Sequence, residues 1–279
     1  MEAPLVRAYL EALPDVAPDE RSIQRVRTCL ASLQTPDVRY LVAALLGPRS
    51  AAVARVAGAI LHAAGAPTAT LGRSLGDLRL GDVPIDEGLI GKAGTISASA
   101  GYQLAYSAPE LGELSRREGV VILALTAFAE ASQRVALLLD PPVDPSDPVH
   151  APRPDLVVIG PLDGPGLDRA LDLVPKGCPL VIAPMPEAAR ESAEERITKA
   201  GMPALVGGRD YAVVGRDGQL EVLVRGEPYV RVDAVPDLSL DEIATGIAAA
   251  LALGALGIRM REDWVVAGIA ALGAVPVGS

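Results

Sequence analysis

Apolar residues recur at helical spacing near both ends of the chain. Leu5, Tyr9 and Leu13 fall on one face of a predicted helix over residues 3–13, and the same spacing predicts a second helix over 19–33. Pro109 is expected to break or kink a later one. The remaining predicted helices cover residues 51–64, 100–118, 167–174, 186–200, 241–256 and 262–272.

Between these helices, short apolar runs predict strands. The runs are continuous rather than alternating, which is typical of a parallel sheet that is covered on both faces. They cover Arg39–Leu46, Val120–Leu125, Arg134–Asp140, Asp155–Gly160, Pro179–Ala183 and Ala204–Gly207. Residues 65–99 show no sustained periodicity and are predicted to form a long loop with a short strand or helix. Such long segments are usually functional or mobile.

After Arg209 the pattern changes to three short strands separated by turn residues such as Gly-Arg-Asp-Gly, which predicts a β-hairpin or meander near residues 209–233. The predicted fold class is therefore α/β, with three layers and a mostly parallel sheet flanked by helices. We expect a single domain over 1–279. Its predicted parts are N-terminal helices 1–36, a core sheet 37–208, the meander 209–233 and C-terminal helices 239–273.

Composition narrows the classes of partner and compartment. Half of the residues are apolar, which is ample for a core, and the net charge of -10 repels phosphate backbones and anionic lipid, so we expect neither nucleic acid nor a membrane as partner. The most apolar stretch, 243–258, contains three Gly and is shorter than the ~20 residues of a membrane span. Without a signal-peptide pattern, the chain is predicted to be cytoplasmic. Cys29 and Cys178 are isolated and are expected to be reduced thiols.

Several segments carry a resemblance to a known family. Residues 59–65, AILHAAG, are similar to the helix that follows the phosphate loop in folylpolyglutamate synthases, within the Mur ligase superfamily. Residues 152–160, PRPDLVVIG, and 176–181, KGCPLV, resemble later segments of the same proteins, so the resemblance extends over nearly the whole chain. It implies a Mur ligase central-domain-like fold with P-loop NTPase-like topology, and an ATP- and magnesium-dependent amide-bond ligase. These ligases continue into a C-terminal domain, whereas this sequence stops at Ser279, so we expect a truncated member.

The phosphate loop departs from the family pattern. The family motif is GTNGKGS or GTNGKT, and the corresponding stretch here is Leu46–Ala52, LGPRSAA. Ser50 stands where the resemblance places the phosphate-binding lysine, Ala52 stands where it places the magnesium hydroxyl, and Pro48 lacks an N–H. Arg49 lies one position early and is forked, so it is a poor substitute for lysine. We favour a plain strand-to-helix turn with Ser50 as helix cap.

The family's metal stations are altered as well. Asp163 stands near the family's Asp-His pair without the histidine, and the helix that should carry a carbamylated lysine has no lysine before Lys176. The residues that could still bind nucleotide are Gly47, Arg49, Ser50 and Asp163. No catalytic residue and no metal ligand is predicted.

Other candidate groups are weaker. Asp140, Asp144 and Asp147 are three carboxylates in a short loop, but the interspersed prolines favour a solvated loop over a metal site. His62 and His150 have no motif partner, and a ligand or base role is not favoured for either. The glycine-rich residues 72–76 neither follow a clear strand nor open a helix, so they are weak as a phosphate loop.

These patterns predict a catalytically degenerate, folylpolyglutamate synthase-like pseudoenzyme without a cofactor. It would serve as a non-catalytic binding or assembly subunit, as a homo-oligomer or as the partner of an active ligase-family protein. The alternative is an ATP- and magnesium-binding ligase subunit that acts with a separate chain. A third hypothesis is that residues 65–99 bind a pterin-like or other small molecule without nucleotide.

Overall fold

The computed structural model describes residues 1–142, 144–162, 164–216 and 219–274. Contacts between Cα atoms divide the chain into two compact units. Unit 1 consists of Met1–Val42 and Ala69–Arg153, and unit 2 consists of Ala43–Thr68 and Pro154–Ser279. The expectation of a single domain, with its boundaries, stays a prediction. No helix in the described part of the chain is both long and apolar enough to cross a membrane.

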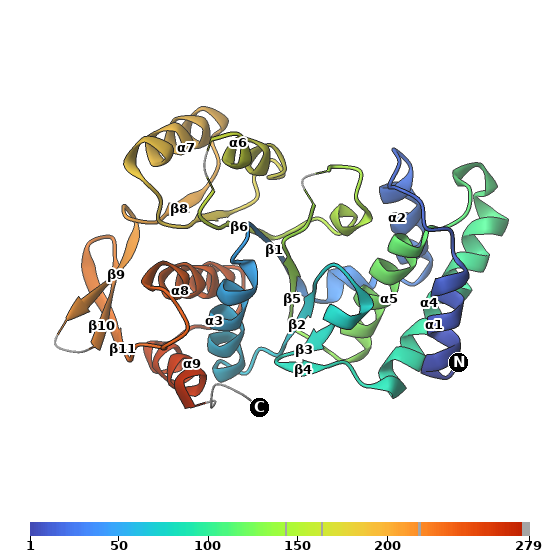
Figure 1. The fold of residues 1–279 in the computed structure, drawn as a ribbon, viewed down its shortest axis with the longest axis horizontal. Helices are drawn as coiled ribbons and strands as arrows, with labels where there is room; N and C mark the ends of the chain where they lie inside the picture. Colours follow the sequence, from blue (N-terminus) through green and yellow to red (C-terminus); the bar gives the residue numbers. More distant parts are fainter. Residues whose placement is uncertain (143, 163, 217–218, 275–279) are drawn as a thin grey trace. The chain divides into compact units, whose positions relative to one another are not determined.

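Eight strands in the described residues form one sheet in the order β4-β3-β2-β5-β1-β6-β7-β8. Neighbours among β1, β6, β7 and β8 run parallel, while β2, β3 and β4 pair antiparallel. The sheet is flanked by helices, so the predicted α/β class with a mostly parallel sheet is confirmed (Figure 1). The strands are β1 (Leu41–Leu46), β2 (Thr68–Leu71), β3 (Arg79–Leu80), β4 (Val83–Pro84), β5 (Val135–Leu139), β6 (Leu156–Ile159), β7 (Leu180–Ile182) and β8 (Ala204–Val206).

Unit 2 is layered because its strands are apolar on both faces. One face packs against α6 (Gly164–Asp172) and α7 (Glu187–Ala200), where Leu171 and Ile197 meet alternate strand residues such as Ile159. The opposite face is covered by α8 (Leu240–Ala255), which contacts β6 and β7. Helix α3 (Ser50–Ala63) packs beside α8, and α9 (Glu262–Ala274) packs against α3. The predicted three-layer arrangement is therefore present in this unit.

A second, three-stranded sheet lies in unit 2, with antiparallel order β11-β10-β9. Leu220, Val222 and Val232 turn one face of it toward a core shared with α3, α8 and α9. The predicted meander is thus confirmed. Its strands are β9 (Tyr211–Arg216), β10 (Gln219–Val224) and β11 (Glu227–Val232).

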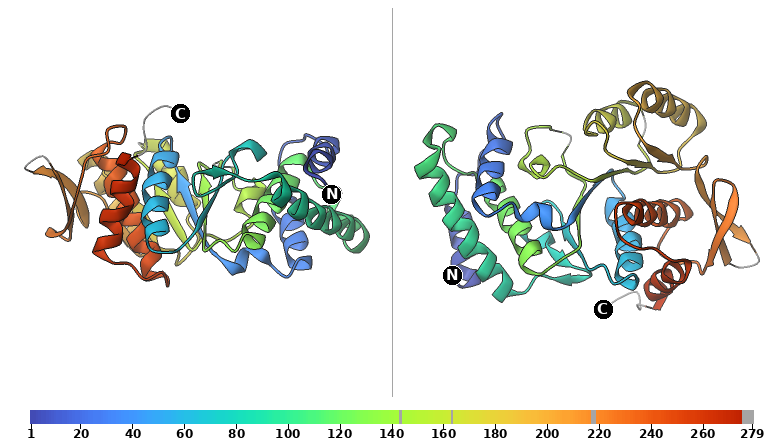
Figure 2. Two further views of the ribbon diagram at one scale, coloured as in Figure 1. Left: turned by 90° about the horizontal axis from the view of Figure 1, so that it is seen from below. Right: turned by 180° about the vertical axis from the view of Figure 1, so that it is seen from behind.

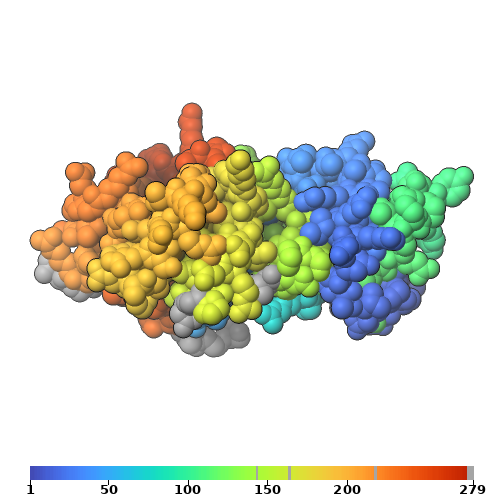
Figure 3. Space-filling model, turned by 90° about the horizontal axis from the view of Figure 1, so that it is seen from above, coloured from blue at the N-terminus to red at the C-terminus, as the bar shows by residue number. Residues whose placement is uncertain are grey.

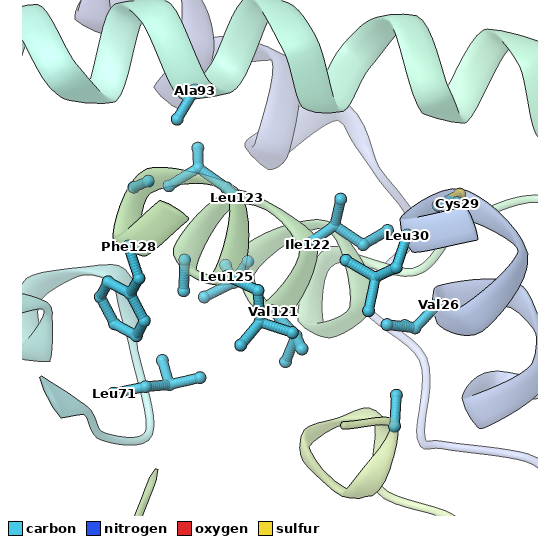
Figure 4. Close-up of a cluster of buried hydrophobic side chains, with 14 of the residues drawn as sticks. Val26, Cys29, Leu30, Leu71, Ala93, Val121, Ile122, Leu123, Leu125 and Phe128 are labelled. Carbon is cyan, nitrogen blue, oxygen red and sulfur yellow. The ribbon is translucent and has the colours of Figure 1, made fainter. Parts of the chain in front are cut away.

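Unit 1 is built around one fully enclosed helix, α5 (Arg116–Glu130). Every residue of α5 from Glu118 to Phe128 is buried, because α1, α2 and α4 pack around it and strands β2 and β5 share its core. Figure 4 shows Leu123 facing Ala93 of α4, and Ile122 facing Leu30 of α2. The surrounding helices are α1 (Ala3–Ala12), α2 (Ser22–Ser32) and α4 (Glu87–Ser107), with 3₁₀ turns at Pro36–Arg39, Leu75–Asp77, Pro109–Leu111 and Pro148–His150.

Two predictions are wrong in this unit, and one is confirmed. The run Val120–Leu125 is helical rather than a strand, because a helix that is buried on all sides is also a continuous apolar run. The break expected at Pro109 in the predicted helix 100–118 is confirmed, since α4 ends at Ser107 and α5 begins at Arg116. Residues 65–99 are not mainly loop, because they contain β2, β3, β4 and the first half of α4.

Candidate functional site

The turn between β1 and α3 is where the sequence placed a residual phosphate loop. Gly47 follows the strand with φ of +111°, a conformation that favours glycine. A Cβ atom there would lie 3.5 Å from Gly160 Cα and 3.7 Å from Leu162 Cδ2, so the backbone after β6 and an apolar side chain lie close over the turn. The turn is therefore compact.

The first turn of α3 uses its own amides internally. Ser50 N–H donates to Gly47 O at 3.1 Å, and the amides of Ala52 and Val53 both donate to Arg49 O, at 3.0 and 3.2 Å. Pro48 has no amide proton. Few of the donors that a phosphate cradle requires are thus available at this helix end.

Arg49, rather than Ser50, is the N-cap residue of α3, and no side-chain cap hydrogen bond is present. The prediction that Ser50 caps the helix is therefore wrong. Ser50 is the first helical residue, and it is only 6% exposed. A residue this enclosed does not project into solvent as a phosphate-binding lysine would have to.

Sequence reasoning missed Glu242, which is the partner of Arg49. Glu242 Oε1 accepts from Arg49 Nε, and Glu242 Oε2 accepts from the amide of Ser239, the N-cap of α8, at 2.8 Å. The Glu242 side chain is 6% exposed, whereas that of Arg49 is 56% exposed. The hydrogen bond from Arg49 is the main cause that lowers the pKa of Glu242, so this carboxylate is held in its charged form.

This pair lies where two helices begin side by side. Arg49 opens α3 and Glu242 lies in the first turn of α8, while further along a Cβ on Gly246 would lie 2.4 Å from Val56 Cβ. The two helices therefore run in the same direction, and the positive ends of their dipoles adjoin. Glu242 supplies the negative charge that this position favours, so the protein itself fills the role that a bound anion would have.

Within unit 2, Lys176 and Lys199 both lie away from this turn. Lys176 precedes β7 and so lies at the amino edge of the parallel strands, whereas Gly47 follows β1 at the carboxyl edge. Lys199 is in the last turn of α7, a crossover helix that also ends at the amino edge. Lys92 belongs to unit 1 and pairs with Glu130.

Three of the predicted nucleotide-binding residues, Gly47, Arg49 and Ser50, lie together in the turn. They are neighbours in the sequence, so their proximity does not by itself indicate a site. Asp163 lies outside the described residues. Asp168, near the implied carbamylated-lysine station, pairs instead with Arg196 of α7 at 2.6 Å.

The three loop carboxylates do not converge. Asp140 pairs with Arg73 at 2.7 Å, Asp144 accepts from Ser146, and Asp147 accepts from the amide of Val149. No group of three potential metal ligands occurs among the residues that the structure describes. Each carboxylate therefore already has a hydrogen-bond or ion-pair partner.

The two histidines that the sequence singled out do not form a site together. His62 is exposed in the last turn of α3, and His150 Nε2 lies 2.8 Å from Pro142 O. Cys29 and Cys178 are both buried.

Unit 1 holds a cavity of about 410 Å³ that the sequence did not reveal. Its lining combines apolar side chains with four arginines and two acids, so the lining charge is positive in an otherwise acidic chain. Arg73, Ser74 and Leu75 bring part of the segment 65–99 to this cavity. The lining residues are Arg7, Leu10, Glu11, Asp15, Arg73, Ser74, Leu75, Arg116, Arg117 and Val120.

Two of the cavity arginines, Arg7 and Arg116, are held by exposed ion pairs. Arg7 pairs with Glu87, and the two side chains are 49% and 64% exposed. Arg116 Nη1 lies 3.3 Å from Asp15 Oδ2, while its buried Nε has no hydrogen-bond partner among the described residues. Exposed pairs of this kind are worth at most about 1 kcal/mol, so these cations can exchange partners.

Comparison with solved structures relates this architecture to known proteins. The folylpolyglutamate synthetase from Lactobacillus casei aligns over 98% of this chain and 72% of its own, with 17% identity and a TM-score of 0.77. An FPGS–AMPPCP–folate complex aligns over the same shares, with 17% identity and a TM-score of 0.79. The Mycobacterium tuberculosis folylpolyglutamate synthase complexed with ADP aligns over 96% of this chain and 65% of its own, with 17% identity and a TM-score of 0.72.

No protein-family model matches the sequence, and no curated protein matches it. The resemblance to the folylpolyglutamate synthases is thus confirmed at the level of the fold, which is what similarity at this identity establishes.

Proposed function

We propose that this chain is a folylpolyglutamate synthase-like protein that does not form amide bonds and serves as a non-catalytic binding or assembly subunit. The observation that carries the proposal is the Arg49–Glu242 pair at the adjoining helix ends. In these folds an acyl phosphate intermediate requires a lysine and free amides around the nucleotide phosphates. Here the cation of the turn is already neutralised by a protein carboxylate.

Electrostatics oppose nucleotide binding at this turn. A triphosphate approaching Arg49 would meet Glu242, whose pKa is lowered and which therefore stays charged near neutral pH. If the phosphate paired with Arg49, the carboxylate of Glu242 would lose its cation while remaining almost fully buried. An unpaired buried carboxylate destabilises the folded protein. Magnesium does not remove this difficulty, because Ala52 offers no hydroxyl ligand at the position implied for it.

Isothermal titration with ATP and magnesium tests the proposal. We expect no binding up to millimolar nucleotide. Micromolar binding would refute the proposal and support the alternative, an ATP-binding ligase subunit that acts with a separate chain. Glu242→Gln frees Arg49 while keeping a side chain that can cap α8, and Glu195→Gln on the exposed face of α7 is the matched control. If nucleotide bound the Glu242→Gln variant alone, Glu242 would be identified as the group that excludes it.

The cavity of unit 1 supports a second function, the binding of a small molecule without nucleotide. Its arginines favour an anionic group, and Leu10, Leu75 and Val120 favour an apolar body. A volume of about 410 Å³ falls within the usual range for small-ligand sites. The ligand class that fits is therefore a small amphipathic carboxylate or sulfonate.

A fluorescent amphipathic anion, 8-anilinonaphthalene-1-sulfonate, is a suitable probe for this cavity. We expect saturable binding that Arg117→Ala weakens at least about fivefold, because Arg117 lines the cavity from the first turn of α5. Arg196→Ala, which removes an arginine from α7 in unit 2, is the control. Equal binding by both variants would place the probe elsewhere and refute this function.

A further inference from the structure

The three-stranded meander and the start of α9 form a groove in unit 2. The groove shares no residue with the nucleotide turn or with the unit 1 cavity. Its volume is about 620 Å³, which falls within the usual range for small-ligand sites. Figures 1 and 2 show the orange meander beside the red α9, and Figure 3 shows the orange segment at the surface. The lining residues are Arg216, Glu221, Pro228, Tyr229, Val230, Arg231, Glu262, Asp263 and Val266.

Two arginines of this groove share one buried carboxylate. Glu221 of β10 lies opposite Arg231 of β11, and its Oε1 accepts from Arg231 Nε at 3.2 Å and from Arg231 Nη2 at 3.1 Å. Its Oε2 accepts from Nη1 of Arg216, on β9, at 3.2 Å. The Glu221 side chain is 6% exposed, whereas those of Arg216 and Arg231 are 60% and 57% exposed. A buried group therefore fixes both guanidinium groups while they remain accessible from solvent.

One positive charge of this arrangement is left unneutralised, because two guanidinium groups meet a single carboxylate. Each guanidinium has five N–H donors in a fixed fork, so donors remain after the hydrogen bonds to Glu221 are made. The arrangement differs in this respect from Arg49, whose single charge is matched by Glu242. Guanidinium groups with spare donors favour a carboxylate as ligand, because the fork matches the geometry of its two oxygens.

Another part of the lining is acidic. Glu262 and Asp263 lie in the first turn of α9. Asp263 pairs with Arg261 at 2.9 Å, whereas the Glu262 side chain has no ion pair or hydrogen bond within the part of the chain that the structure describes. Burial and, to a lesser extent, the charge of Glu262 raise the pKa of Tyr229, so this carboxylate lies near the tyrosine hydroxyl. Glu262 can therefore accept a cationic group of a ligand.

Tyr229 connects the basic and acidic parts of the lining. The register of β10 and β11 shifts between Val222 and Leu223, and Tyr229 is the residue of β11 that this bulge leaves without an opposite residue. Tyr229 lies two positions from Arg231, which is roughly 7 Å along a strand. An extended dipeptide spans about 7 Å as well. The separation of the charged groups therefore matches a ligand of two or three amino-acid residues.

We propose that this groove binds a short peptide with free ends, a dipeptide or tripeptide that carries an apolar side chain. The peptide carboxylate pairs with Arg216 and Arg231, and the peptide ammonium group pairs with Glu262. Tyr229 and Val266, which is 40% exposed, contact the apolar side chain. A ligand with one sign of charge fits less well, because the arginines repel a simple cation and the two acids of α9 repel a simple anion.

Isothermal titration of the full chain with the dipeptide alanyl-phenylalanine tests this site. We expect saturable binding with a dissociation constant on the order of 0.2 mM for a ligand of this size. N-acetyl-alanyl-phenylalanine lacks the ammonium group and alanyl-phenylalanine amide lacks the carboxylate, so each should bind at least about fivefold more weakly. Absence of binding at about 10 mM dipeptide, or equal binding of the blocked peptides, would overturn the inference.

Variants of two exposed residues test the two ends of the peptide separately. Glu262→Gln should weaken binding of the free dipeptide at least about fivefold and leave the N-acetyl peptide unaffected, because only the ammonium group meets Glu262. Arg216→Gln should weaken binding of the free dipeptide and leave the amide unaffected, while Arg231 still pairs with Glu221.

Glu195→Gln on the exposed face of α7 is the control and should bind as wild type does. Circular dichroism confirms that the variants fold. Equal losses for the free and the blocked peptide in both variants would overturn the assigned contacts, because a general change in structure does not distinguish the peptide ends. The nucleotide titration tests a different part of unit 2, so its outcome does not depend on this groove.

Discussion

The Arg25–Glu118 pair makes the stability of unit 1 depend on one buried charge contact. Glu118 is fully buried in the first turn of α5, and its carboxylate accepts from Arg25 Nη2 at 2.7 Å and from Arg25 Nε at 2.9 Å. Arg25 Nη1 also donates to Leu111 O at 3.0 Å. Arg25→Met keeps most of the side-chain volume and removes every one of these donors.

The loss of unfolding free energy in Arg25→Met follows from the hydrogen bonds that the Glu118 carboxylate would keep. Its carboxylate would keep only the amide of Ser115, at 3.0 Å, among the hydrogen bonds described here. Removing one partner of a buried ion pair costs about 3–5 kcal/mol. We expect about 3 kcal/mol for Arg25→Met, because the remaining amide still stabilises the charge. With a urea m-value of about 3 kcal/mol/M, the unfolding midpoint should fall by roughly 1 M.

Urea unfolding followed by far-UV circular dichroism measures this change, and hydrogen exchange of the α5 amides locates it in unit 1. Arg27→Met on the exposed face of the same helix is the control, with an expected loss below about 1 kcal/mol. The double variant Arg25→Met/Glu118→Met should recover at least half of the loss, since apolar residues replace buried ion pairs well. A loss below about 1 kcal/mol for Arg25→Met, or a double variant less stable than the single one, would refute the reasoning.

Three further outcomes are expected. Glu242→Gln should lower the urea midpoint of unfolding at pH 7, measured by the fluorescence of Trp264, the single tryptophan, in α9. Because the pKa of Glu242 is lowered in the folded state, the difference in midpoint from wild type should shrink as the pH falls from 5 toward 2.5. Burial raises the pKa of Cys29 to about 12, so iodoacetamide should alkylate it at least about 100-fold more slowly in the folded chain than in urea, as peptide mapping by mass spectrometry would show. Gly246→Ala should destabilise by about 2 kcal/mol in the same urea assay, since its Cβ would lie 2.4 Å from Val56 Cβ, and Val56→Ala should relieve part of the loss.

The pattern of hydrophobic residues predicted most of the fold, because most helices and strands bury their apolar residues at a spacing that the sequence shows. Strands of the parallel sheet are apolar on both faces, and the amphipathic helices show their period. The pattern failed at α5, where burial on all sides removes the period. A local signal was present, because Ser115 and Glu118 form a Ser-x-x-Glu capping box just before the apolar run. That signature marks a helix start and distinguishes α5 from a strand.

The candidate site was less predictable than the fold. The sequence located the turn around Gly47 and the serine at position 50, where the resemblance places a lysine, since both are local. The partner of Arg49 lies 193 residues away, on a helix whose start is marked by Ser239 and Glu242. Local residues identify that start, but only the packing of α8 beside α3 determines which cation it meets. The unit 1 cavity was missed for the same reason, because its lining comes from three separate segments.

Units 1 and 2 contain the same arrangement of a capping-box glutamate paired with an arginine, with different consequences. In each, a Ser-x-x-Glu capping box holds a glutamate that is nearly or fully buried, and an arginine from a distant helix end or face pairs with it. Arg25 is 7% exposed, so its pair with Glu118 is inaccessible to solutes and serves packing. Arg49 is 56% exposed, so its pair with Glu242 meets solvent where the nucleotide-binding turn would be. The same motif is structural in unit 1, and in unit 2 it determines the charge that any approaching anion encounters, which is why the nucleotide titration is aimed at Glu242 rather than at Ser50.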